Sequence, residues 1–182
     1  MNLRDGMMNI KLKQTYKEML STLEKNSTCS RIKVASIIVK DGRIISTGWN
    51  GVPSGFKHCE QIFKIEDRSV CAGHTCIEMK NYFYNDMKLY SEEEFLRLHH
   101  EFSEKYEIHA EANAISFAAK NNISTEGASM FVSITPCSSC AKSIMASGIK
   151  KLYYKKVYDR SSDGFDLLKE AELKGLIHLE KI

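Results

Sequence analysis

The sequence is poor in the features that mark fibrous, disordered and membrane-spanning chains. Only 2 of its 182 residues are proline, and it holds no internal repeat and no low-complexity tract. No apolar run approaches the roughly 18 residues that a membrane-spanning helix needs. With 43% hydrophobic and 27% charged residues, the composition is that of a globular domain. It excludes disorder, collagen and coiled coil, and no membrane partner is expected.

The chain also has little excess of charge of either sign. The 26 Lys+Arg and 23 Asp+Glu leave a formal net charge of +3, which is too small to predict nucleic acid as a partner. The first residues, MNLRDGMMNIKLKQ, lack the apolar core of a signal peptide. We therefore expect a cytoplasmic protein, in the host cytoplasm if it is viral. In that reducing compartment the 6 cysteines are expected as thiols or thiolates.

Hydrophobic periodicity predicts an α/β protein with a single domain over residues 1–182 and an insertion at about 60–106. Before the insertion the pattern predicts a helix over 11–25 and a hairpin of strands 33–39 and 43–49, joined by Asp41-Gly42 and followed by a loop over 50–55. Inside the insertion, Ser91 to Glu94 form a capping box that opens a helix to about residue 103.

After the insertion, helices and strands alternate, which favours a largely parallel sheet covered on both faces. The expected elements are a helix over 109–121, a strand over 129–134, a helix ending at Gly148, a strand over 151–155, a helix over 165–174 and a strand over 176–182. Thr135 is the expected N-cap of the middle helix, with Pro136 at its first position.

Two short motifs stand at the starts of consecutive helices. One is His109-Ala110-Glu111, and the other, 28 residues after the histidine, is Pro136-Cys137-Ser-Ser-Cys140. Alone, the first is typical of a solvated helix start, and the second of a redox pair or half a structural zinc site. Together, the HxE and PCxxC motifs form the signature of zinc deaminases that act on nucleobases.

The chemistry of these residue types explains the pattern. A helix start lowers thiol pKa, so Cys137 and Cys140 can bind zinc as thiolates beside His109. Three protein ligands leave the fourth tetrahedral position for water, as in a catalytic site. Zinc lowers the pKa of that water to roughly 7, and the hydroxide attacks C4 of the base. Glu111 is the expected proton shuttle.

Longer stretches resemble the deoxycytidylate (dCMP) deaminase family, especially its bacteriophage branch, from about residue 11 to 182. The stretches that carry the resemblance are RIISTGWNG (43–51), EIHAEANAI (107–115), EGASMFV (126–132), TPCSSCAK (135–142) and SGIKKLY (147–153). The resemblance implies a three-layer α/β/α fold with a five-stranded mixed sheet. It also implies hydrolysis of dCMP to dUMP with release of ammonia, which supplies dUMP for thymidylate synthesis.

The same resemblance implies substrate contacts. Asn50 is expected to hold the deoxyribose, and Ala110 to touch the substrate; the alternative for Asn50 is a turn asparagine before Gly51. Phosphate needs donors near the pocket. The candidates are Ser30, Arg31 and Tyr158, although Arg31 also fits a solvated surface charge.

A second, structural zinc is also implied by the resemblance to phage-type relatives. Its expected ligands are Cys29, Cys59, His99 and Glu107. His100 adjoins His99 and is an alternative ligand. A rival cluster is Cys71, His74 and Cys76, and a third possibility is that no second metal binds.

Members of the family are commonly hexamers that dCTP with Mg²⁺ activates and dTTP inhibits. We therefore expect a homo-hexamer with these two effectors. Phe117 and Lys120 lie where the family places subunit and effector contacts. A core aromatic and a solvated lysine are the alternatives.

Three other functions compete with this hypothesis. A deaminase of tRNA or single-stranded DNA would need a basic track and aromatic platforms, which a nearly balanced charge does not favour. A riboflavin-pathway deaminase shares the zinc motifs but not the GWNG loop. A non-catalytic, zinc-stabilised binding module explains the cysteines and histidines but gives no role to Glu111.

Overall fold

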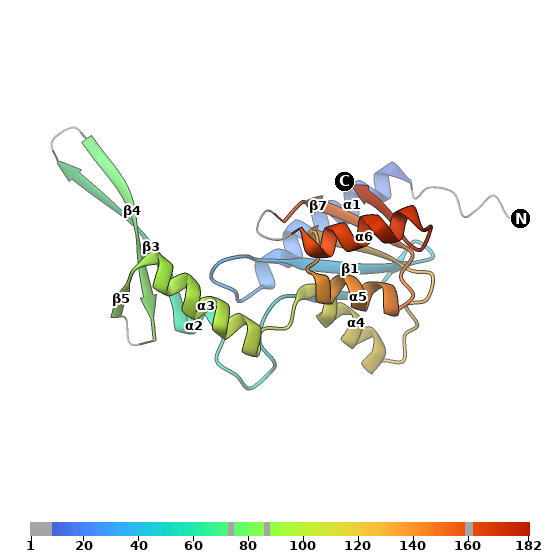
Figure 1. Cartoon of the computed structure of the whole chain (residues 1–182), viewed down its shortest axis with the longest axis horizontal. Helices are drawn as coiled ribbons and strands as arrows, with labels where there is room; N and C mark the ends of the chain where they lie inside the picture. The colour runs from blue at the N-terminus through green and yellow to red at the C-terminus, as the bar shows by residue number, and fades with distance from the viewer. Residues whose placement is uncertain (1–8, 73–74, 86–87, 159–161) are drawn as a thin grey trace, which may run out of the picture. The chain divides into compact units, whose positions relative to one another are not determined.

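The computed structural model describes residues 9–72, 75–85, 88–158 and 162–182, without the side chains of 68 and 70–79. The chain forms two compact units, coloured along the sequence in Figure 1. The first unit comprises the chain up to Ser27, Val34–Asn50 and His109–Ile182. The second comprises Thr28–Lys33 and Gly51–Ile108. Among the described residues, no helix has both the length and the apolar character to cross a bilayer.

A five-stranded mixed sheet is the centre of the first unit. Its strand order is β2-β1-β6-β7-β8, with β1 antiparallel to both neighbours and β6, β7 and β8 parallel. The strands are β1 (Ala35–Lys40), β2 (Arg43–Trp49), β6 (Ser129–Ile134), β7 (Lys151–Lys156) and β8 (His178–Lys181). The mixed sheet is confirmed, and so are the parallel strands expected after the insertion.

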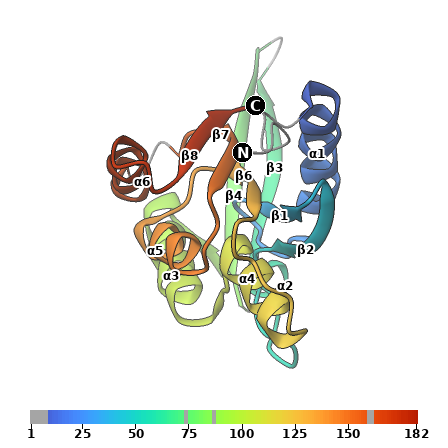
Figure 2. The ribbon, with the colours of Figure 1, turned by 90° about the vertical axis from the view of Figure 1, so that its right-hand side faces the viewer.

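Helices cover both faces of this sheet, which confirms the three-layer fold. Helix α1 (Ile10–Leu23) lies on one side of the strands, and α5 (Ser138–Ala146) and α6 (Asp163–Leu173) lie on the other, as Figure 2 shows. Strand residues alternate between the two cores because successive side chains point to opposite faces. One core joins Tyr16 and Leu20 of α1 to Ile37, Val39, Phe131 and Tyr153. The other joins Ile38, Met130, Val132 and Leu152 to Ala114, Ile144 and Leu168.

The N-terminal elements follow their sequence patterns. In α1, Tyr16 and Leu20 are buried and Leu23 packs against them, whereas Leu12 and Met19 of the predicted stripe are exposed. A short 3₁₀ helix, η1 (Glu24–Asn26), follows α1. Asp41 and Gly42 both have positive φ, at 51° and 71°, as a two-residue type I′ hairpin turn requires.

The start of α5 differs from the prediction. The helix begins at Ser138 and its N-cap is Cys137, whose backbone is extended at φ −70° and ψ 171°. The prediction that Thr135 is the N-cap and Pro136 the first helical residue is wrong, because Thr135 bonds elsewhere. Its N–H donates to the carbonyl of Lys156, and its Oγ1 accepts the N–H of Tyr158.

The second unit contains a sheet that the sequence pattern did not predict. Strands β3 (Phe63–Ala72), β4 (Thr75–Tyr84) and β5 (Lys88–Tyr90) form an antiparallel sheet in that order. Its core joins Phe63 and Phe95 to Cys29 and Cys59. Helices α2 (Cys59–Ile62) and α3 (Glu92–Tyr106) belong to the same unit. The Ser91 hydroxyl accepts the N–H of Glu94, which confirms the predicted start of α3.

Candidate active site and second metal centre

Helix α4 (Ala110–Lys120) lies close against β1 and β2. Hydroxyl groups of the strands hold it: Ser36 donates to the carbonyl of Ala110, and Ser46 to that of Ala114, at 2.7 and 2.6 Å. A Cβ on Gly48 would lie 2.3 Å from the oxygen of Ala110, so only glycine allows this approach. The start of α4, where the HAE motif stands, is therefore fixed by the sheet.

The first candidate site joins the starts of α4 and α5. His109 is the N-cap of α4 and Cys137 that of α5, and neither side chain caps its own helix. The Nδ1 atom of His109 lies 3.4 Å from Sγ of Cys137 and 3.5 Å from Sγ of Cys140. The ligand atoms of all three residues lie within 4.8 Å of one another. The structure thus brings together the three residues predicted to hold the catalytic zinc.

The two thiols of this site are electrostatically different. Cys140 donates its proton toward Cys137, which with a hydrogen bond to His109 lowers the pKa of Cys137 to about 3. The same hydrogen bond and burial raise the pKa of Cys140. A thiolate and an imidazole that face one point are ligands that zinc prefers. The residues present therefore fit zinc, with three protein donors among the described residues.

Glu111 lies in the first turn of α4, two residues after His109. Its side chain is buried, with 4% of the residue exposed. Burial raises the pKa of this carboxyl above its ordinary value, while the charge of His109 acts in the opposite direction. Since a raised carboxyl pKa is typical of a group that transfers protons near neutral pH, the environment suits the predicted role.

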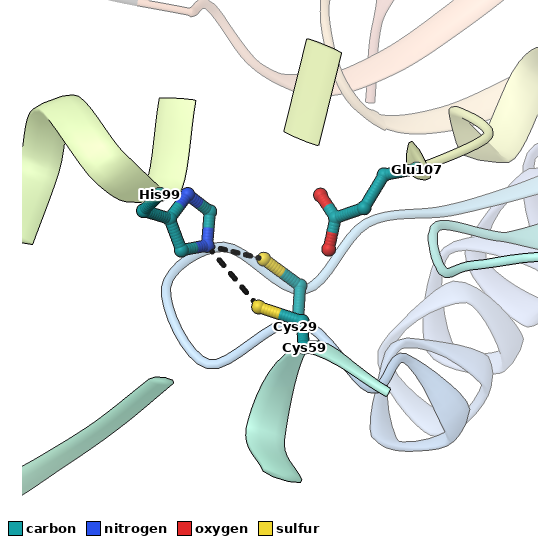
Figure 3. Close-up of side chains that lie close together, drawn as sticks. All are labelled: Cys29, Cys59, His99 and Glu107. Atoms are coloured by element: carbon teal, nitrogen blue, oxygen red, sulfur yellow. Dashed lines mark hydrogen bonds between the residues drawn. The ribbon is translucent and has the colours of Figure 1, made fainter. Parts of the chain in front are cut away.

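The second candidate centre lies entirely within the second unit. Figure 3 shows Cys29, Cys59, His99 and Glu107 directed toward one point. The Nε2 atom of His99 lies 3.5 Å from Sγ of Cys29 and 3.3 Å from Sγ of Cys59. All four ligand atoms lie within 4.8 Å of one another, although the residues come from a loop, α2, α3 and the residue after α3. The structure thus brings together the four predicted ligands of a second zinc.

Glu107 shows that this cluster suits a cation. Its Oε2 accepts a hydrogen bond from the Ser103 hydroxyl, whereas its Oε1 is buried with no hydrogen-bond partner among the described residues. Burial raises the pKa of this carboxyl. A hydrogen bond from Cys59 lowers the pKa of Cys29 to about 4. A buried carboxyl oxygen without a partner beside a thiolate is stabilised either by protonation or by a cation that binds there. Two sulfurs, an imidazole and a carboxylate form a closed, structural donor set.

The alternatives to these ligands are placed differently. His100 is exposed, whereas His99 is buried against the sulfurs, so His100 does not join the cluster. The backbones of Cys71 and Cys76 pair across β3 and β4. Their side chains and the whole of His74 lie outside the described residues.

The predicted substrate residues lie in both units. Asn50 is buried, and its Oδ1 accepts hydrogen bonds from the Ser27 hydroxyl at 2.6 Å and the Val34 N–H at 2.8 Å. Ala110 is buried at the start of α4. Tyr158 belongs to the first unit.

The two other phosphate candidates lie at the second candidate centre. The Ser30 hydroxyl lies 3.4 Å from Sγ of Cys59, and Nη1 of Arg31 lies 3.4 Å from Nδ1 of His99. Arg31 is partly buried there, so the alternative of a solvated surface charge does not describe it.

Phe117 and Lys120 both lie on the exposed part of α4. Phe117 is 55% exposed, so the alternative of a core aromatic is wrong. Lys120 is exposed as well. Sequence reasoning also missed Ser27, which orients Asn50, because a serine before a loop carries no signal of that role.

A three-layer fold with a Cys₂His cluster at two helix starts and a buried glutamate beside it defines a zinc-binding deaminase. The chain belongs to the cytidine and deoxycytidylate deaminase family, whose zinc-binding-region model matches residues 10–156.

Relatives and solved structures agree with this assignment. The chain is 41% identical over 162 residues to the deoxycytidylate deaminases of Enterobacteria phages T2 and T4. The match covers 84% of this chain and 84% and 82% of those proteins. The dCMP deaminase of cyanophage S-TIM5, solved in complex with dCMP and dUMP, matches with a TM-score of 0.66 and 29% identity. That match covers 97% of this chain and 100% of the cyanophage chain.

Proposed function

We propose that the protein hydrolyses dCMP to dUMP and ammonia and so supplies dUMP for thymidylate synthesis. The observation that carries the proposal is the cluster of His109, Cys137 and Cys140 beside the buried Glu111. The 41% identity to phage deoxycytidylate deaminases and the likeness to a structure with dCMP and dUMP bound favour this substrate over other cytosine compounds.

His109, through Nδ1, and the thiolates of Cys137 and Cys140 would hold the catalytic zinc. When bound, zinc lowers the pKa of water and stabilises negative charge near the reacting carbon. The protein itself supplies the ligand geometry. Both helix starts favour negative charge on the thiolates, because their N–H dipoles point toward the cluster.

Glu111 would carry protons between water and the base. As a carboxylate it accepts a proton from the attacking water, and as an acid it donates that proton to N3 of the cytosine ring. Once the water oxygen is bonded to C4, Glu111 accepts the proton of that new hydroxyl group and transfers it to the amino group. The C4–N bond then breaks, ammonia leaves, and the oxygen remains as the C4 carbonyl. Burial keeps bulk water away from this carboxyl and raises its pKa above the ordinary value.

Asn50 would bind the deoxyribose, and Ala110 would contact the substrate at the start of α4. The two hydrogen bonds that Oδ1 of Asn50 accepts hold its carboxamide in one orientation. An amide held in one orientation can recognise a sugar hydroxyl group through a hydrogen bond. Ser30, Arg31 and Tyr158 are the proposed donors for the 5′-phosphate, and Arg31 supplies the only full positive charge of the three.

Cys29, Cys59, His99 and Glu107 would hold a structural zinc. The donor set is complete without water, and its buried carboxylate oxygen favours a cation. This centre would hold the loop over 28–33 against α3.

We further propose a homo-hexamer that dCTP with Mg²⁺ activates and dTTP inhibits. The exposed aromatic ring of Phe117 on α4 supports a subunit contact there, and Lys120 on the same helix offers a positive charge to an effector phosphate.

The experiment is ammonia release from dCMP, with deoxycytidine as the matched substrate that lacks phosphate and dCTP added in a parallel reaction. We expect turnover of dCMP but not of deoxycytidine, and a higher rate with dCTP. Equal turnover of both substrates would overturn the phosphate site. No turnover of either by zinc-loaded protein would overturn the proposal and favour a nucleic-acid substrate.

A further inference from the structure

The turn that carries Cys137 is held by the last residue of β7 and by the chain that follows this strand. Thr135, two residues before Cys137, is buried with 4% exposed. Its N–H donates to the carbonyl of Lys156 at 2.9 Å, and its Oγ1 accepts the N–H of Tyr158 at 2.8 Å. The hydroxyl group therefore ties the turn before α5 to the chain after β7.

Gly164, in the first turn of α6, meets the same turn. A Cβ added to Gly164 would lie 2.2 Å from the carbonyl oxygen of Pro136 and 2.4 Å from the carbonyl carbon of Cys137. Both are backbone atoms, so no side-chain rotation can relieve the contact. The φ of Gly164 is outside the left-handed region, which means that space and not backbone conformation demands glycine here.

The position of this turn decides where one ligand of the active site lies. The carbonyl carbon of Cys137 is bonded to the Cα that carries the Sγ ligand, so a shift of the peptide moves the sulfur. Zinc–sulfur bonds tolerate only about 0.2 Å around their usual length. His109 comes from α4, which the sheet holds independently. A shift of Cys137 therefore cannot be followed by the histidine.

We propose that Gly164 and Thr135 are positioning residues for the active-site zinc. They hold the Thr135–Cys137 turn so that Cys137, His109 and Cys140 can all bind the same ion. Neither residue is one of the three proposed zinc ligands. The inference rests on the proposed function, because it takes these three residues as the zinc ligands.

The test compares Gly164→Ala with Leu168→Ala, which removes core packing from the same helix without touching the turn. Zinc affinity is measured by competition with a chelator, and the ligand field by absorption of the cobalt-substituted protein. For Gly164→Ala we expect a roughly 10- to 100-fold loss of affinity for one ion and an altered sulfur-to-cobalt band. The centre at Cys29 and Cys59 serves as the internal reference, with unchanged affinity. Leu168→Ala should lower thermal stability and leave both affinities unchanged.

A second pair of variants decides the matter if Gly164→Ala fails to fold. Thr135→Val keeps the shape and removes the acceptor for Tyr158, whereas Thr135→Ser keeps the hydroxyl. We expect weaker zinc binding in the first variant and its recovery in the second. Parent-like zinc affinity and cobalt spectrum in Gly164→Ala, or in Thr135→Val where the first variant is unfolded, would overturn the inference. If the parent bound zinc but did not deaminate dCMP, the proposed function would fail and the positioning role would stand.

Discussion

Glu111 is the residue that distinguishes a catalytic zinc site from a purely structural one. It lies two positions after His109 in the first turn of α4, and its carboxyl is buried while Cys137 and Cys140 come from another helix. A structural zinc site has no need of a buried, ionisable group that is not one of its ligands. A hydrolytic deaminase needs one, because a proton must pass from water to the base and to the leaving amine.

We expect Glu111→Gln to lose activity on dCMP by roughly 10²- to 10⁴-fold, because an amide cannot accept and return a proton. Zinc content should be unchanged, since the three ligands are retained. The measurements are kcat for ammonia release and metal analysis of the same preparation. Glu18→Gln on the exposed face of α1 is the matched control and should keep parent activity. Loss of zinc in Glu111→Gln would instead make Glu111 part of the metal site.

The proposed active-site residues could be predicted from the sequence because each of the two motifs is local. In HAE the ligand His109 and the glutamate are two residues apart, and in PCxxC the two cysteines are three residues apart. Residues this close in a helix start are also close in the folded chain. The N-cap of α5 was misplaced for the opposite reason. The bonds of Thr135 to Lys156 and Tyr158 come from more than 20 residues away, and no local pattern contains them.

At the scale of elements, the second candidate metal centre shows which residues a local sequence pattern cannot bring together. Its ligands lie on the loop before β1, at the start of α2, in α3 and just after it. Only the family resemblance selected them from the sequence. The sheet of β3, β4 and β5 was missed altogether, although its register pairs ten residues of β3 with ten of β4. Its strands follow no strict alternation of apolar and polar residues along their whole length. The side chains that pack against the core of the unit, such as Ile65, Tyr82 and Tyr84, lie at the end of the hairpin away from its turn.

Glu107→Gln tests whether a metal joins these elements. If zinc binds here, the variant loses an anionic ligand, and we expect it to bind about one zinc fewer per chain and to melt at a lower temperature. Ligand binding at 100 times Kd contributes about 2.7 kcal/mol to stability, which sets the size of the effect. Metal analysis and thermal unfolding with and without chelator provide the measurement.

The opposite result has a distinct physical meaning. If Glu107 is only a buried carboxyl, its amide relieves an unfavourable charge, and Glu107→Gln should be as stable as the parent or more so. Glu104→Gln, exposed on the same helix α3, is the matched control and should change neither zinc content nor melting temperature.

At the scale of the whole molecule, α4 carries both a residue of the candidate active site and an exposed aromatic ring. Its buried residues Ala114 and Ala118 pack inward, and its first turn carries Glu111. Phe117, between those two alanines, is 55% exposed. An exposed aromatic ring on the helix that carries the proposed catalytic glutamate is suited to a contact between subunits.

We expect Phe117→Asp to reduce the particle mass, because burial of such a ring contributes roughly 1.5–3 kcal/mol per contact and the aspartate would add an unpaired charge. Light scattering after size exclusion measures the mass across a range of concentrations. The matched control is Leu173→Asp on α6, where the leucine is 90% exposed, and its mass should equal that of the parent. Both variants should keep their zinc, which would show that α4 still positions His109. An unchanged mass for Phe117→Asp, or a monomeric parent, would contradict the proposed assembly through α4, and any effector site would then have to form within one chain.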